Sequence, residues 1–135
     1  MGFYPAPGMT ASATIEPARI VKISGSNTVA TCGANEAAYG VSGTSAAAFN
    51  ATSHATSGLP VTIHCIQGEV VEVVAGGTIA AGDLLKSDAS GGAVAAATTG
   101  TTAQNIVGVA NEAAASGDRF KMTIRIQNLV YPALA

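Results

Sequence analysis

Short apolar runs that alternate with polar residues recur along the chain, and the clearest covers residues 119–127. Every second residue of this segment is apolar: Phe120, Met122, Ile124 and Ile126. Successive side chains of a strand point to opposite faces, so this period of two predicts a strand with one buried face. The opposite face carries three of the six basic residues. We interpret that face as a solvated outer surface, with contact to an acidic partner surface as the alternative.

Further strands are predicted from the same alternation, each ended by glycine, asparagine or aspartate at turn positions. Their ranges are 18–24, 28–32, 37–42, 59–67, 69–74, 84–87, 93–97 and 105–110. Residues 46–49 and 113–117 are candidates for at most a single helical turn. The chain is therefore predicted to be mainly β, a small single-domain β-barrel or sandwich.

Two turns in the middle of the chain place aspartate beside glycine, at Gly82-Asp83 and at Asp88 to Gly92. An aspartate side chain can accept a hydrogen bond from the backbone two residues on, and glycine can supply a positive φ. A calcium loop needs more oxygen ligands at close intervals than Asp83 and Asp88 provide. We therefore expect turns here, and no metal site.

Three segments fall outside the strand pattern and divide the chain. Residues 1–14 contain Pro5 and Pro7 and predict an extended N-terminal arm, because each proline fixes φ and keeps the residue before it out of a helix. Residues 43–58 are rich in Ser, Thr and Ala and predict a long surface loop. The β domain is predicted to span residues 15–130, and residues 131–135 form a C-terminal tail.

These outlying segments supply the candidate contact residues, because they hold aromatic and apolar side chains outside the predicted core. An arm with two aromatic residues either frays or orders on a neighbouring subunit or partner, and we expect the second. The candidates for contact with a partner or a second subunit are Phe3, Tyr4, Pro5, Pro7, Met9, Phe49 and Tyr131.

Charge is sparse in this chain of 135 residues, at 10% of residues and a net charge of −2, against about 25% charged residues in ordinary globular proteins. The basic residues lie singly, so no basic stripe is available for nucleic acid. No run approaches the ~20 apolar residues of a membrane span, and the N-terminal residues lack the pattern of a signal peptide. A partner would be held by shape and apolar contact, which favours a role in assembly.

Motifs for catalysis and cofactor binding are missing from the sequence. His54 lies in a polar loop, and His64 and Cys65 point to opposite faces of a predicted strand, so neither histidine suggests a catalytic triad. No nucleophile elbow, phosphate-binding glycine motif, CxxC or HExxH occurs. Cys32 and Cys65 are interpreted as small buried hydrophobic residues, with a disulfide in an oxidising compartment as the alternative. We expect no enzyme activity and no cofactor.

An ordered series of motifs fills the C-terminal half. An apolar strand at 70–74 is followed by GGTIAAGDLLKSDASG (76–91), a small-residue strand with a Thr-rich spacer (93–100), VGVANEAAASGD (107–118) and a closing strand (120–126). In this order the motifs resemble the capsid cement, or head-decoration, proteins of tailed bacteriophages. No catalytic residue comes with that family.

The resemblance implies a small β domain on the outer surface of the virion capsid, made in the cytoplasm of a bacterial host. There it would bridge subunits of the major capsid protein and associate with itself, as trimers in preference to dimers. Copies that bind only the assembled lattice would stabilise it by mass action. One alternative is a β-clip-like ligand-binding or catalytic domain, suggested by residues 79–85. Another is an adhesive or carbohydrate-binding head protein, against which the 4% aromatic content argues.

Overall fold

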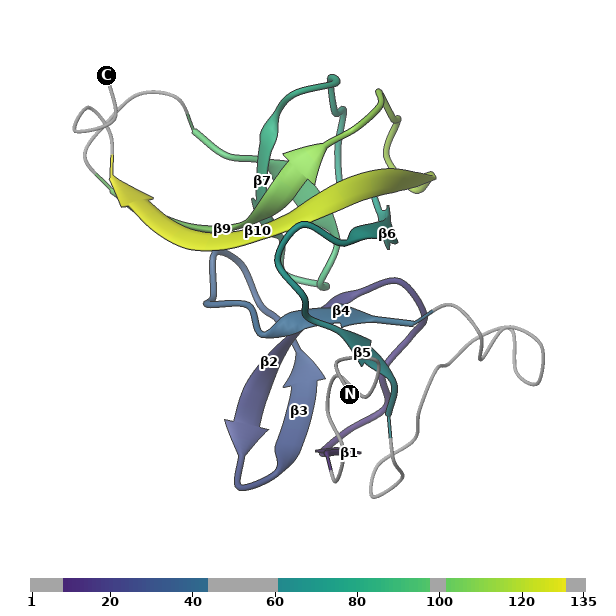
Figure 1. Ribbon diagram of the computed structural model, residues 1–135, viewed down its shortest axis with the longest axis vertical. Coiled ribbons are helices and arrows are strands. Elements are labelled where there is room, and N and C mark those ends of the chain that lie inside the picture. The colour runs from purple at the N-terminus through teal and green to yellow at the C-terminus, as the bar shows by residue number, and fades with distance from the viewer. Residues whose placement is uncertain (1–8, 44–60, 98–101, 131–135) are drawn as a thin grey trace.

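The computed structural model describes residues 9–43, 61–97 and 102–130, and in these ranges every regular element is a strand. The strands form two five-stranded sheets (Figure 1). The first contains β1 (Thr10–Ala11), β2 (Ile20–Gly25), β3 (Thr28–Thr31), β4 (Gly40–Ser42) and β5 (Ile63–His64). The second contains β6 (Val70–Val74), β7 (Leu84–Ser87), β8 (Ala93–Ala95), β9 (Ala103–Ala110) and β10 (Arg119–Val130). The prediction of a small, mainly β domain is confirmed.

β2 lies at the centre of the first sheet, whose order is β1-β3-β2-β4-β5. It pairs antiparallel with β3 and β4, whereas β1 runs parallel to β3 and places Ala11 opposite Val29. β1 falls within residues 1–14, so the end of the predicted arm segment adds an edge strand to this sheet. Of the predicted loop at 43–58, residues 44–58 lie outside the described residues.

Several predicted strands are shorter in the structure: the strand expected at 37–42 is Gly40–Ser42, and the strand expected at 93–97 is Ala93–Ala95. The strand expected at 18–24 begins at Ile20, because Ala18 has a φ of 59° and so lies in the left-handed region. The strand expected at 59–67 is reduced to Ile63–His64 within its described part. Its pairing is limited by β4, which is three residues long and pairs only Val41 and Ser42 with it.

The second sheet curls into a half-barrel, in the order β6-β10-β9-β7-β8. Its two edges meet where Ala75, just after β6, forms a parallel bridge with Ala93, the first residue of β8. The N–H of Gly76 donates to the carbonyl of Ala93 at 2.8 Å. In Figure 1 the long β10 wraps across this sheet above the first one.

Two Gly-Asp turns of the half-barrel have the same hydrogen bonding. Asp83 Oδ2 accepts the N–H of Ala80 at 2.9 Å, and Asp118 Oδ2 accepts the N–H of Ala115 at 3.2 Å. The glycine before each aspartate has a φ near 90°. The segments before the turns pair with each other, since Ile79 and Ala114 exchange both main-chain hydrogen bonds. The turns at Gly82-Asp83 and Gly117-Asp118 therefore form related structures that pack side by side.

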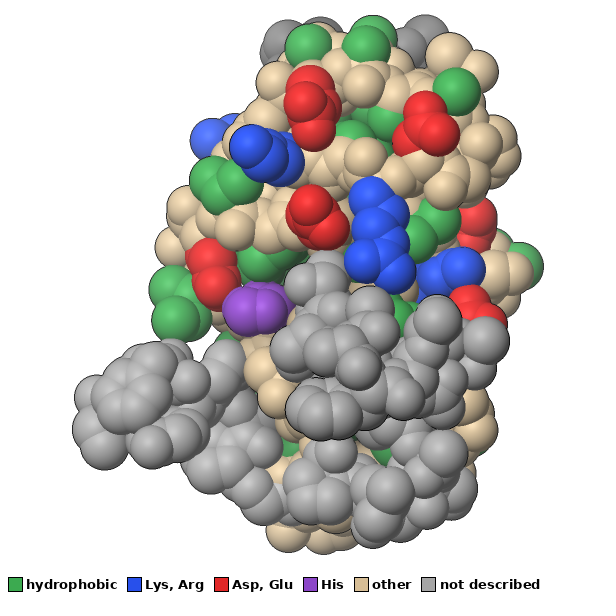
Figure 2. Space-filling model, turned by 90° about the vertical axis from the view of Figure 1, so that its right-hand side faces the viewer, with side chains coloured by type: hydrophobic (Ala, Val, Ile, Leu, Met, Phe, Trp, Pro, Cys, Tyr) green, Lys and Arg blue, Asp and Glu red, His purple; other side chains and the backbone are tan. Residues whose placement is uncertain are grey.

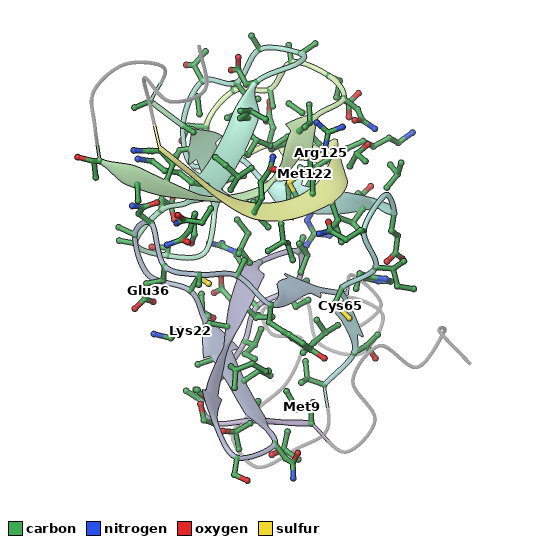
Figure 3. The ribbon with its side chains drawn as sticks, turned by 60° about the vertical axis from the view of Figure 1, so that its left-hand side comes forward. Met9, Lys22, Glu36, Cys65, Met122 and Arg125 are labelled. Atoms are coloured by element: carbon green, nitrogen blue, oxygen red, sulfur yellow. The ribbon has the colours of Figure 1, made fainter. Side chains whose placement is uncertain are left out.

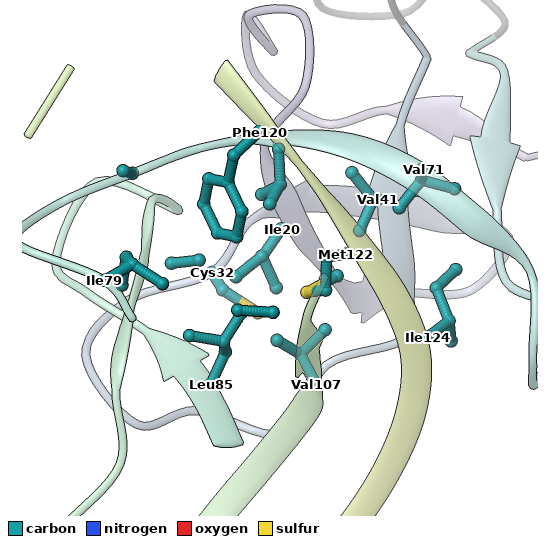
Figure 4. Close-up of a cluster of buried hydrophobic side chains, with 14 residues drawn as sticks. Ile20, Cys32, Val41, Val71, Ile79, Leu85, Val107, Phe120, Met122 and Ile124 are labelled. Carbon is teal, nitrogen blue, oxygen red and sulfur yellow. The ribbon is translucent and has the colours of Figure 1, made fainter. Parts of the chain in front are cut away.

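The main core lies between the two sheets (Figure 4). Ile20 and Val41 of the first sheet and Cys32, just after β3, face residues on the concave side of the half-barrel, among them Leu85, Phe120 and Met122. The next residue of β2, Val21, points to the other face and joins a second cluster with Ala11, Ile15, Val29, Val61 and Ile63. The first sheet is therefore buried on both faces, as the alternation of a strand allows.

Main-chain hydrogen bonds also join the sheets directly. The N–H of Ile20 donates to the carbonyl of Gly91 at 2.8 Å, and the N–H of Val74 donates to the carbonyl of Ala18 at 3.0 Å. The N–H of Asn35 donates to the carbonyl of Ser87 at 2.9 Å. Because core and hydrogen bonds both cross this junction, the two sheets form one unit.

Candidate interaction surfaces

Met9 is the one predicted contact residue that the structure describes. Its side chain is half-buried and packs against the second core cluster, close to the first sheet (Figure 3). The other candidates lie outside the described residues: Phe3, Tyr4, Pro5, Pro7, Phe49 and Tyr131. Met9 thus anchors the point at which the predicted arm joins the sheet.

The outer face of β10 carries Arg119, Lys121 and Arg125, all exposed. The alternating residues Phe120, Met122 and Ile124 are buried, at 2%, 0% and 1% exposure, as the sequence pattern predicts. Acidic groups lie among the basic ones: Glu72 is 4.0 Å from Arg119, and Glu112 Oε2 accepts the N–H of Lys121 at 2.8 Å. Figure 2 shows acidic and basic side chains interspersed over one side of the molecule. This face is therefore not a basic patch.

The turn between β5 and β6 presents apolar side chains to solvent. Ile66 is 46% and Val70 53% exposed. The turn between them is held against β10, because the N–H of Gly68 donates to Ile124 and the N–H of Ile124 donates to Glu69, each at 2.8 Å. A side chain held in this way loses little conformational freedom on binding. The alternation along the predicted strand at 59–67 did not single out Ile66 as a surface residue.

His64 and Glu69 form a polar pair beside this turn. His64 Nδ1 lies 2.9 Å from Glu69 Oε2, and both side chains are about one-third exposed. Neither His64 nor Glu69 carries a hydroxyl or thiol group that could act as a nucleophile. In the described part of the chain, no three His, Cys, Asp or Glu side chains are grouped as metal ligands. No helix there has the length and apolar character needed to cross a membrane.

Neither cysteine forms a disulfide. Cys32 lies in the core between the sheets, where burial, and next the charge of Glu36, raise the pKa of its thiol to about 11. Cys65 is half-buried and packs against the second core cluster. The interpretation of Cys32 as a small buried hydrophobic residue is confirmed, and the alternative of a disulfide with Cys65 is not what the structure shows.

We expect the two thiols to differ strongly in reactivity at pH 8. The thiolate is the reactive form, so Cys32, buried and with a raised pKa, should react with a maleimide only after unfolding. Cys65 should react in the folded protein. Mass spectrometry after timed labelling measures this, and labelling of Cys32 at a rate equal to that of Cys65 would contradict it.

Lys22 and Glu36 form an ion pair on the outside of the first sheet (Figure 3). Lys22 Nζ donates to Glu36 Oε1 at 2.7 Å, and the same oxygen accepts the N–H of Gly33 at 2.5 Å. These two hydrogen bonds lower the pKa of Glu36, and the bond to Glu36 raises the pKa of Lys22. The pair fixes the segment between β3 and β4 against β2.

Glu36→Gln is expected to reduce stability slightly at neutral pH. A carboxyl group with a lowered folded pKa stabilises the fold above its unfolded pKa, and that stabilisation is lost as pH falls through the folded pKa. The difference between the wild type and Glu36→Gln should therefore shrink on acidification below the usual pKa of glutamate. Urea unfolding at several pH values measures it. In a Lys22→Met background the substitution should have a smaller effect, and an unchanged effect would contradict the pairing.

The half-barrel packed on a second sheet defines the class of fold, a small two-sheet β domain. A crystal structure described as the head fiber gp8.5 N base in bacteriophage phi29 has a similar fold, with a TM-score of 0.66 and 20% sequence identity. The similarity covers 87% of this chain and 90% of that one. No protein-family model matches the chain, and no curated protein matches it. At this identity, the similarity shows a shared fold.

Proposed function

We propose that this protein is a structural component of a tailed-phage head, of the cement or decoration type, which binds the outer surface of the assembled major capsid protein lattice. The observation that carries the proposal is the fold, which over nearly its whole length is similar to that of a phage head-fibre base. The series of motifs at residues 70–126 supports the same class independently, because it resembles cement proteins without reference to any structure.

The described surface is compatible with such a role. Its acidic and basic groups are interspersed (Figure 2). Ile66 and Val70, two exposed large apolar side chains, lie on either side of a turn whose main chain is hydrogen-bonded to β10. Interfaces of this kind rely on apolar contact at the centre with polar groups around it. Many weak sites acting on a repeating lattice are sufficient to stabilise it.

The test is binding of the purified protein to expanded capsids that lack it, assembled from the major capsid protein of the same phage. Saturable binding at a fixed ratio of copies to capsid subunits supports the proposal. Absence of binding would favour the β-clip-like alternative. A chain lacking residues 1–8 keeps β1 and should fold but lose most capsid binding, because we propose that the arm makes the contact. A chain lacking residues 131–135 removes Tyr131 and tests that candidate contact separately.

Capsid binding is expected to resist salt. Charged contacts are screened within about 8 Å at physiological ionic strength and about 3 Å at 1 M, whereas apolar contacts are not weakened by screening. The apparent Kd should change less than about threefold between 0.1 M and 0.5 M NaCl. Sedimentation of capsids with bound protein at each salt concentration measures this. Release of the protein at 0.5 M NaCl would show that ion pairs, and not apolar contacts, hold it.

A further inference from the structure

The strands β9 and β10 continue together beyond the half-barrel as a two-stranded ribbon. β6 pairs with β10 only from Arg119 to Thr123. Past Ile124, β10 pairs with β9 alone, from Gln127 opposite Ile106 to Val130 opposite Ala103. Figure 1 shows this end of β10, with β9 beside it, extending away from β6 and β7. Each strand of the ribbon therefore has one outer edge.

The outer edge of β9 in the ribbon is closed by Asn35. Its Oδ1 accepts the N–H of Asn105 at 2.9 Å, and its Nδ2 donates to the carbonyl of Ala103 at 3.0 Å. The main-chain groups of these β9 residues thus point away from β10. In an antiparallel ladder, residues directly opposite each other share this orientation. Asn128, opposite Asn105, and Val130, opposite Ala103, therefore point their main-chain groups away from β9.

Within the described residues, the outer edge of β10 has fewer hydrogen-bond partners toward the C-terminal end of the strand. The main chain of Ile124 bonds to the main chain of Gly68 and Glu69. The next outward-facing residue, Ile126, bonds through its N–H and its carbonyl to the side-chain amide of Gln67, at 2.9 and 3.1 Å. Within the described part of the chain, no strand lies beside Asn128 and Val130 on this edge.

An open strand edge is a template for another strand unless charges or proline block it. Residues 127–130 are Gln, Asn, Leu and Val, so this edge has no charge and no proline. The nearest charged residue, Arg125, lies outside the open stretch. The edge strand β6 differs, because Glu72 is its central residue and self-pairing there would set two carboxylates opposite each other.

We propose that the open edge of β10 pairs antiparallel with the same edge of a second copy of this chain, around a two-fold axis at residue 129. Asn128 of one copy would then exchange two main-chain hydrogen bonds with Val130 of the other, and the symmetric pair would form two more. No like charges meet in this register. The pairing is a property of the isolated protein and does not depend on capsid binding. It yields a dimer, in place of the trimer that the cement-family resemblance favours.

Sedimentation velocity over a wide range of protein concentrations tests the proposal. The wild type should show a monomer–dimer equilibrium, weak because only four hydrogen bonds form. Asn128→Pro removes the edge N–H without removing a main-chain bond to β9, and should leave a monomer at every concentration. Asn128→Ala loses the side-chain bond to Asn105 but keeps the N–H, so it should still dimerise. A wild type that stays monomeric, or a dimer unaffected by Asn128→Pro, would overturn the proposal.

Cysteine cross-linking decides the register and does not rely on the proline variant folding. In a Cys65→Ala background, Leu129→Cys places the two thiols across the two-fold axis, where Cα atoms about 4.5 Å apart suit a disulfide. Oxidation should give a covalent dimer. Gln127→Cys is the matched control and should cross-link at least tenfold less. Equal cross-linking of the two variants, or a trimer with no Leu129→Cys disulfide, would contradict the two-fold pairing.

Discussion

Replacing Gly91 with alanine is expected to destabilise the fold by about 3 kcal/mol, from left-handed strain and overpacking together. Gly91 has a φ of 77°, and a Cβ there would lie 2.5 Å from Thr31 Cγ2 and 3.0 Å from the carbonyl oxygen of Ile20. The carbonyl of Gly91 also accepts the N–H of Ile20 at 2.8 Å. The loop cannot retreat without giving up this bond between the two sheets.

Gly82→Ala is the control that separates strain from the clash. Gly82 has a φ of 90°, but a Cβ there would meet no atom within 4 Å. Only the left-handed strain remains, so the expected cost is about 1 kcal/mol. Urea unfolding of both variants measures the difference. Equal destabilisation would show that the close approach of the 88–92 loop to β2 and β3 does not contribute to stability.

Replacing Asn35 with alanine is expected to cost about 2 to 3 kcal/mol, for two hydrogen bonds and the loss of a residue that tolerates the left-handed region. Asn35 has a φ of 55° and holds the end of β9 through both atoms of its side-chain amide. Its own main chain bonds to Ser87 and to the side chain of Asn105. The residue thus connects the first sheet to two strands of the second.

Two further variants assign the cost of Asn35→Ala. Asn35→Gly removes the same side-chain bonds but relieves the backbone strain, so it should be less destabilising than alanine. Asn27→Ala changes another asparagine of similar φ, 56°, which is exposed in the hairpin turn between β2 and β3. Its expected cost is about 1 kcal/mol. Thermal unfolding compares the three, and an Asn35→Ala cost no larger than that of Asn27→Ala would contradict the bridging role.

Local pattern was sufficient to predict most of the strands. β10 could be recognised because one face is buried, so every second residue from Phe120 to Ile126 had to be apolar. The turn at Asp88 was predictable for a similar reason: Asp88 Oδ1 accepts the N–H of Ser90, two residues on, at 2.8 Å, and Gly91 has a positive φ. Both features depend only on residues that are close together in the sequence, so they can be predicted from the sequence alone.

Contacts between distant residues could not be predicted in this way. Asn35 stands in an unremarkable loop sequence, and its partner Asn105 follows 70 residues later. The open edge of β10 depends on where β6 stops pairing with β10 and on the side chain of Gln67. The alternation of apolar and polar residues predicts neither of these. At Ala18 the local pattern predicted a strand that does not form. Ala18 is an apolar residue in a strand-like run, but it has a left-handed φ, and its carbonyl accepts the N–H of Val74 at the junction of the sheets.

The central claim, that the protein decorates a phage head, is tested most directly by electron cryomicroscopy of expanded capsids with and without the added protein. We predict additional density on the outer surface at regularly repeating lattice positions, with the two-sheet domain fitting that density. Capsids that look the same with and without saturating protein would contradict the claim.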